Sequence, residues 1–231
     1  MNHWGPAVVV CLLASPLAAH AQSASLFVSV SAGVNVMPHE NEETRFAGSA
    51  APEEVGQVST STGPALVGAI GRDLRKGLRM QIEVSYRANR IKGDSRLAGE
   101  DLGSATERKY GGMVNALYDL HRSRITPYVG GGVGGQFVHE PNTVSSSGGI
   151  EVSVEGGTKI AFAYQVLAGA AFAIRDGLAV IADYHFLDLV GSRTFKGTAT
   201  IPGAGSLAFT DRSSHDQNHS VVVGIRCAFG G

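Results

Sequence analysis

Residues 159–189 read KIAFAYQVLAGAAFAIRDGLAVIADYHFLDL, and this stretch decides the fold. Apolar side chains occupy every second position over 160–174, a turn signal with a glycine follows at 175–177, and the alternation resumes over 178–186. A period of two predicts a long antiparallel hairpin with one apolar and one polar face. A buried helix is the competing interpretation of 160–174, but this segment is shorter than the about 20 residues that a membrane-spanning helix needs.

The same alternation recurs along the whole chain. It predicts strands at residues 26–36, 63–72, 78–87, 110–120, 125–138, 160–174, 178–186 and 219–229. The third of these strands is the most diagnostic, because its apolar positions alternate with Arg79, Glu83 and Arg87. A face with ionisable side chains cannot lie in a dry apolar core unless those side chains have partners.

The predicted strands are joined alternately by long and short connections. The long ones span 38–62, 91–106, 139–158 and 192–214, and we expect them to be exposed loops of about 15 to 25 residues. Such asymmetry is typical of a transmembrane barrel. In such a barrel the sheet must close, because lipid offers no hydrogen bonds to unpaired backbone N–H and C=O groups. The six Tyr residues all fall on predicted strands, as interfacial aromatic belts require. We therefore predict an all-β, eight-stranded antiparallel transmembrane up-and-down β-barrel; a soluble eight-stranded barrel has the same periodicity and is the alternative.

Composition indicates one domain and an exported chain. The 231 residues include 31 Gly and only 17% charged residues, and no charged or Pro-rich linker divides them. The net charge of −1 gives no basic footprint for nucleic acid. A short apolar run at 7–18 precedes Ala19-His20-Ala21, a small-x-small cleavage site, although no Lys or Arg precedes the run. We predict a cleaved signal peptide at 1–21 and a barrel domain at 22–231.

Three segments carry a family resemblance. They are TPYVGGGVG at 126–134, FAYQ at 162–165 with Gly169, and NHSVVVGIR at 218–226 with Phe229. In order and spacing the chain resembles small bacterial outer-membrane proteins with an OmpA-like or opacity-protein-like barrel, the porin-like surface antigens. The resemblance implies the outer membrane of a Gram-negative bacterium and a last strand read by the barrel-assembly machinery. We assign that signal to Val221, Val223, Ile225 and Phe229. Gly230 and Gly231 depart from the family's aromatic end, and no cell-wall tether is expected.

A polar set shares the non-apolar parity of the predicted strands. Its members are Arg79, Glu83, Arg87, Asn115, Asp119, Gln165, Asp183, His185 and Arg226. An eight-stranded barrel is just wide enough for side chains to fill it, and buried charges persist only when paired. We expect this set to form an interior plug; a narrow gated ion path through the same residues is the alternative.

Catalytic and metal-binding patterns are weak. His219 and Ser220 are adjacent in a strand, so they point to opposite faces and cannot act together as base and nucleophile. The four-residue spacing of His215 and His219 spans about 13 Å in a strand, too far for one metal ion. We expect no enzyme activity, cofactor or metal.

The sequence thus favours a scaffold or surface antigen that supports the envelope and displays loops for adhesion or ligand contact. A small porin-like channel is the first alternative, and a lipid A-modifying enzyme is the second. The expected partners are outer-membrane lipid and lipopolysaccharide, the barrel-assembly machinery and a host or other extracellular surface ligand, with no nucleic acid.

Overall fold

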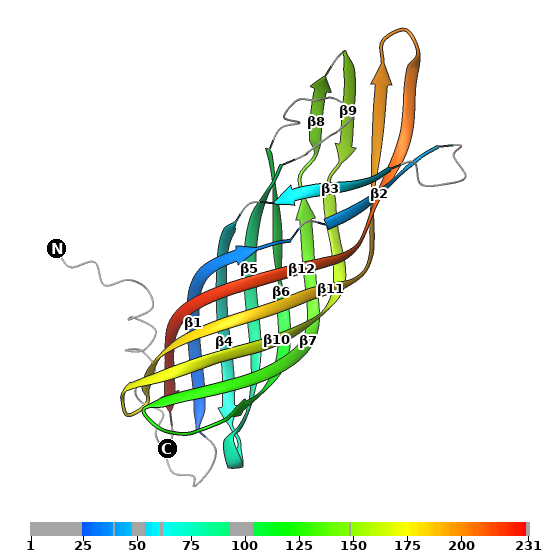
Figure 1. Ribbon diagram of the computed structural model, residues 1–231. Coiled ribbons are helices and arrows are strands. Elements are labelled where there is room, and N and C mark those ends of the chain that lie inside the picture. Colours follow the sequence, from blue (N-terminus) through cyan, green and yellow to red (C-terminus); the bar gives the residue numbers. More distant parts are fainter. Residues whose placement is uncertain are drawn as a thin grey trace, which may run out of the picture.

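Eight antiparallel strands form the body of the molecule (Figure 1). The computed structural model describes residues 25–38, 40–47, 54–60, 62–92, 104–147 and 149–229, so the predicted signal peptide lies outside the described residues. The eight strands are β1 (Leu26–Val36), β4 (Gly63–Asp73), β5 (Leu78–Lys92), β6 (Ser104–Asp119), β7 (Ile125–Glu140), β10 (Gly157–Arg175), β11 (Leu178–Ile201) and β12 (Gly205–Phe229). The hairpin predicted at 159–189 is the β10–β11 pair, and the helix alternative is wrong.

The eight strands close into a barrel. Each pairs with its neighbours in the order β1-β4-β5-β6-β7-β10-β11-β12, and β12 pairs with β1 to complete the ring. The closing pair runs in register from Leu26 opposite Phe229 to Val36 opposite His219. The predicted eight-stranded barrel is therefore confirmed. Among the described residues, no helix has the length and apolarity to cross a membrane.

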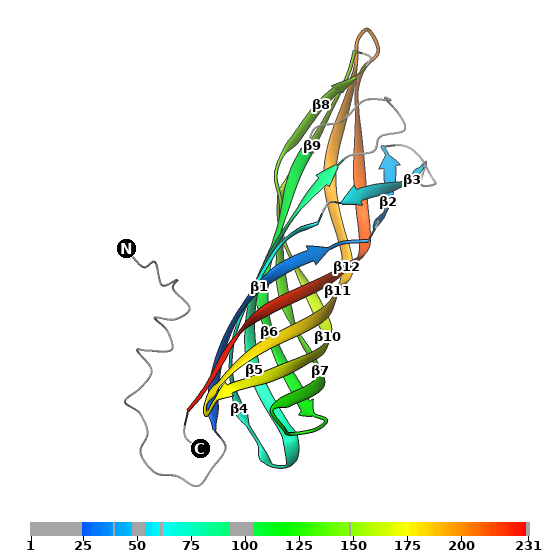
Figure 2. The ribbon, with the colours of Figure 1, turned by 60° about the vertical axis from the view of Figure 1, so that its left-hand side comes forward.

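The predicted long loops at 38–62, 139–158 and 192–214 are largely strands in their described residues, which corrects that expectation, whereas 93–103 of the loop predicted at 91–106 lies outside the described residues. β2 (Glu40–Phe46) and β3 (Glu54–Thr60) pair with each other, as do β8 (Thr143–Ser147) and β9 (Ile150–Glu155). The segment 192–214, expected to be a loop, continues β11 and β12 as a hairpin that projects far above the barrel (Figure 2). Its Thr and Phe residues are β-formers, and they favour strand pairing despite the many Gly and Ser residues.

The opposite end of the barrel has tight connections. Between β4 and β5 the 3-10 turn η1 (Arg75–Gly77) places Lys76 at φ 63° and Gly77 at φ 85°, and Gly177 turns the β10–β11 hairpin at φ 73°. Positive φ suits glycine, which has no side-chain clash there. Short turns mark the periplasmic rim of such barrels and long connections the extracellular rim.

The outer face of the barrel is apolar. Ile82 and Val84 are 59% and 62% exposed, and large apolar side chains at alternate positions of the other barrel strands are exposed in the same way. Two tyrosine-containing rows, each of one cross-strand pair, bound this face on β5 and β6: Tyr118 pairs with Leu78 in the lower row, and Tyr86 pairs with Tyr110 in the upper row. The eight residue steps from Leu78 to Tyr86 span about 27 Å along the strand, or roughly 20 Å along the membrane normal at a tilt of about 40°. The exposed face is thus matched to the apolar layer of a bilayer.

Ile82 lies midway between the two aromatic rows, so Ile82→Arg tests this placement. A lipid-facing arginine at mid-depth should lower the free energy of unfolding by about 2–4 kcal/mol. Leu207→Arg is the matched control, because Leu207 is similarly exposed but lies in the projecting β11–β12 hairpin and should tolerate the charge. Urea unfolding in lipid vesicles, followed by circular dichroism, measures both. Equal losses in the two variants would contradict the placement.

Candidate functional site

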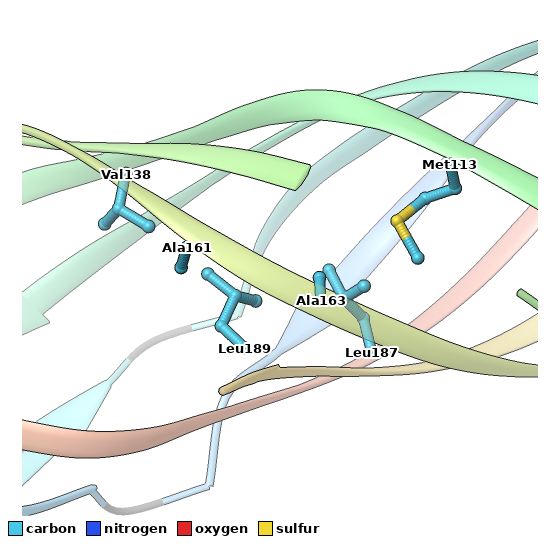
Figure 3. Packing of buried hydrophobic residues seen from close by; sticks show 6 residues of the cluster. All are labelled: Met113, Val138, Ala161, Ala163, Leu187 and Leu189. Atoms are coloured by element: carbon cyan, nitrogen blue, oxygen red, sulfur yellow. The ribbon is translucent and has the colours of Figure 1, made fainter. Parts of the chain in front are cut away.

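The barrel interior is the candidate site, because there the chain gathers its ionisable side chains. One side of the lumen is apolar: Figure 3 shows a buried cluster contributed by β6, β7, β10 and β11. Its members are Met113, Val138, Ala161, Ala163, Leu187 and Leu189. The polar side chains lie in three further clusters, stacked from the periplasmic rim upward. Each is described in turn below.

The basal cluster lies nearest the short turns. It comprises Asp73, Arg79, Asp119, Tyr128, Asp183 and Arg226. Arg79 Nε on β5 donates to Asp119 Oδ1 on β6 at 2.9 Å, and Arg79 Nη2 lies 2.8 Å from the same oxygen in an ion pair. The Arg79 guanidinium also stacks 4.3 Å from the Tyr128 ring centroid, while the Tyr128 hydroxyl donates to Asp183. Asp73 and Asp119 each accept a further contact from the exposed Arg122. Charge and aromatic contacts thus link β5, β6, β7 and β11 inside the lower lumen.

The central cluster surrounds one carboxylate. Glu83 on β5 is fully buried and accepts hydrogen bonds at Oε2 from Asn115 at 2.8 Å and from Gln165 at 3.1 Å. Gln165 also donates to Asn115 Oδ1 at 2.7 Å. His185 Nδ1 lies 3.8 Å from Glu83 Oε1. Since β5 and β10 are not neighbours in the ring, the bond between Gln165 and Glu83 crosses the lumen.

The upper cluster begins with buried amides and hydroxyls. Arg87 Nε donates to Ser220 Oγ at 3.1 Å, and Ser220 donates to Asn35 Oδ1 at 2.7 Å. Asn35 in turn donates to Asn89 at 2.7 Å and to Asn218 at 2.8 Å. These contacts join β5, β1 and β12 across the lumen.

Charged groups complete the upper cluster. Lys109 Nζ lies 2.7 Å from Asp216 Oδ1 and 2.5 Å from Glu107 Oε1, and Arg193 Nη2 lies 3.0 Å from Asp216 Oδ2. All four side chains are buried. Buried charges are stable only in such paired arrangements.

Glycines make room for the clusters. The inner face of β7 presents Gly130, Gly132 and Gly134 in a row, and the β6 side chains lie across them. A Cβ at Gly132 would stand 1.9 Å from Asn115 Oδ1, and one at Gly169 would stand 2.1 Å from Asp183 Oδ1. The glycine-rich motif of the sequence therefore serves close approach of side chains inside the barrel.

The structure places each predicted interior residue on the inner side of its strand. Arg79, Asp119, Asp183 and Arg226 fall in the basal cluster, Glu83, Asn115, Gln165 and His185 in the central one, and Arg87 in the upper one. A small cavity between the basal and central clusters is lined by Tyr128, Asp183 and His185 among others. The sequence did not predict which of these residues contact one another, because that depends on the register of strand pairing.

Sequence reasoning missed several interior residues. They are Asn35, Asp73, Asn89, Glu107, Lys109, Tyr128, Arg193, Asp216, Asn218 and Ser220. Lys109 and Tyr128 were detectable, because Tyr128 has the inward parity of the strand predicted at 125–138 and Lys109 directly precedes the strand predicted at 110–120 with its inward parity. Arg193 was hidden because its segment was interpreted as a loop.

The remaining predicted residues lie on β12. Val221 and Val223 face outward and are each 55% exposed, and Phe229 is the last residue of the strand, opposite Leu26. His219 contacts Tyr184 on the outer face, with Nδ1 and the hydroxyl 2.6 Å apart, whereas Ser220 is buried inside. The two neighbours thus stand on opposite sides of the barrel wall.

Comparison with solved structures gives the same architecture. The chain is similar to outer membrane protein OprG from Pseudomonas aeruginosa, with a TM-score of 0.60 and 12% identity over 90% of this chain and 98% of that one. A major outer membrane protein from Thermus thermophilus gives 0.56 and 12% over 91% and 100%. Neisserial surface protein A gives 0.51 and 14% over 88% and 97%. At these identities the likeness concerns the fold alone.

Sequence relatives identify the family. An outer membrane protein of Gluconacetobacter diazotrophicus is 30% identical over 234 aligned residues, which cover 94% of this chain and 61% of that protein. The chain thus spans about three fifths of the length of this relative. The family model described as outer membrane protein beta-barrel domain matches residues 7–229. The chain therefore belongs to the outer membrane protein beta-barrel family, and its location is the outer membrane of a Gram-negative bacterium.

Proposed function

We propose that this protein is a non-enzymatic scaffold of the outer membrane, with a plugged lumen and an extracellular sheet that contacts surface ligands. The observation that carries the proposal is the set of hydrogen bonds that cross the lumen between strands that are not neighbours in the ring. Gln165 bonds to Glu83 in the central cluster, and Lys109 bonds to Asp216 in the upper one. An eight-stranded barrel has little space beyond what its side chains fill. Crossing bonds at two levels support a lumen closed to ions.

The extracellular strands support the second half of the proposal. The β11–β12 hairpin pairs on one side with β9 and on the other with β2, so the upper sheet is continuous rather than a set of separate loops. Its tip at 201–207 is exposed. A broad, rigid sheet held clear of the membrane suits contact with another surface, since binding residues commonly lie on segments positioned by a rigid scaffold.

A small channel is the second candidate. The cavity between the basal and central clusters favours it, because charged and hydroxyl groups line the cavity on several sides. An ion path would require the contact between Arg79 and Asp119 to open. The lipid A-modifying alternative has less support, because His219 and Ser220 face opposite sides of the wall.

Planar-bilayer recording separates the scaffold from the channel. The folded protein, verified by its altered gel mobility before boiling, should give no discrete current steps, because its lumen is crossed by hydrogen bonds. Discrete steps in the wild type that change in size in Glu83→Ala would establish the channel instead. Arg124→Ala serves as the control, because Arg124 lies outside the lumen over the Phe172 ring.

A pair of substitutions around Asp119 tests whether the basal cluster is a structural element. Arg79→Met removes the buried partner of Asp119 and should lower the free energy of unfolding by about 3–5 kcal/mol. Arg122→Met removes a partner whose side chain is 52% exposed and should cost less than about 1 kcal/mol. Urea unfolding in vesicles measures both values. Similar costs would show that burial of the pair does not stabilise the barrel.

Truncation of the β11–β12 hairpin tests the surface role. Replacing residues 195–211 by Asn-Gly joins the paired residues Thr194 and Arg212 through a two-residue turn. The barrel should still fold, because the membrane part of every strand is kept. Adherence of cells displaying the truncated chain to a plate coated with extracellular-matrix extract should fall to that of cells without the chain. Unchanged adherence at equal surface amounts would refute the role of this hairpin.

A further inference from the structure

A basic row lies on the outer face of the barrel, directly above the upper aromatic row. Arg108 on β6 and His139 on β7 form it, and they are paired opposite each other in the antiparallel register. Both follow the outward parity, since Tyr110 and Phe137, two residues below them, are exposed and stack with ring centroids 5.3 Å apart. The basic row is thus held on rigid, paired strands rather than on a loop.

The neighbours of the basic row extend it sideways. On β10, Thr158 pairs with His139, and its hydroxyl lies 3.0 Å from His139 Nδ1. On β5, Arg90 is paired with Thr106 and therefore lies diagonal to Arg108. Diagonal cross-strand neighbours are about 7–8 Å apart, within reach of long side chains. Two guanidinium groups, an imidazole and a hydroxyl can therefore converge on one ligand.

No acidic side chain faces outward beside Arg108 on the described parts of β5, β6 and β7. From the Tyr86–Tyr110 pair upward, the described outward-facing residues of β5, β6 and β7 are aromatic, basic, Ala or Thr. The Arg108 side chain is exposed and makes no hydrogen bond or ion pair with another described residue. The positive charges of Arg108 and the diagonal Arg90 on neighbouring strands repel each other, which favours an anion between them. The basic row thus lacks a protein counter-ion at Arg108.

The depth of the row indicates which anion is present there. Aromatic side chains of a barrel mark the level of the lipid headgroups, and the long extracellular strands place this rim at the outer leaflet. A basic side chain just above the aromatic belt meets the phosphate groups of the lipid, while the rings below it meet the start of the acyl chains. Tyr110 and Phe137 supply those rings.

We propose that Arg108 and His139, flanked by Arg90 and Thr158, form a binding site for the phosphate of a glycolipid headgroup in the outer leaflet. The guanidinium of Arg108 donates to the phosphate oxygens, and Thr158 and His139 supply further donors. The stacked Tyr110–Phe137 pair contacts the sugar and the adjoining acyl chains. The site faces lipid, so it is independent of the lumen and of the projecting hairpin.

Lipid retention measures this site directly. The folded protein in detergent micelles is mixed with diphosphorylated lipid A, and native mass spectrometry counts the bound lipid. Arg108→Gln should weaken retention about fivefold, the effect of one basic residue near an anionic surface. Arg124→Gln is the matched control, because Arg124 is an exposed arginine at the opposite rim, stacked over Phe172. It should retain lipid as the wild type does.

Two ligand arms complete the test. Dephosphorylated lipid A should be retained equally by the wild type and by Arg108→Gln, which assigns the loss to the phosphate. The proposal is overturned if Arg108→Gln retains diphosphorylated lipid A as well as the wild type, or if Arg124→Gln loses it equally. Displacement of the lipid by inorganic phosphate at the same concentration would also overturn the assignment to a lipid. Unchanged gel mobility before boiling verifies that each variant is folded.

Discussion

Closure of the β12–β1 pair is the constraint on which the rest of the structure depends. A bilayer offers no hydrogen bond to a free strand edge, so every backbone group in the membrane must be paired within the sheet. The register from Leu26 opposite Phe229 to Val36 opposite His219 supplies that pairing. Once the ring is closed with eight strands, its lumen has a fixed and small width. The inner face then has to be filled by side chains of matching size, and the outer face has to be apolar throughout.

The lumen meets this requirement by combining polar groups with glycines. Long side chains reach across the lumen to β12: Arg87 donates a hydrogen bond to Ser220, and Lys109 donates one to Asp216. On the opposite wall the row of glycines on β7 leaves space for Asn115 and its neighbours on β6. Breaking such a buried pair leaves an uncompensated charge, so each member depends on the others. The interior side chains therefore occupy the lumen and also link opposite walls of the barrel through hydrogen bonds and ion pairs, in agreement with the proposed scaffold role.

Much of the architecture could be predicted from alternation alone. The period of two located all eight barrel strands, and the parity of residues such as Glu83 and Gln165 placed them opposite the apolar face. Two things could not be predicted. The extension of β11 and β12 beyond the membrane was missed because its Gly and Ser residues have low strand propensity, which pairing overrides. The partners of Lys109 and Asp216 could not be assigned, because contacts across a lumen depend on register and strand tilt, which sequence separation does not contain.

The strict alternation of the strands also affects how the chain reaches its location. A protein of the outer membrane must first pass through the inner one, where any run of about 20 apolar residues would be retained as a helix. Here polar, glycine and alanine residues interrupt the large apolar ones along each strand, and the mean hydropathy of the chain is only +0.06. The apolar surface does not exist in the extended chain. This surface forms only when the strands pair. The extended chain can therefore cross the inner membrane without being retained, and the folded barrel is stable in the outer membrane.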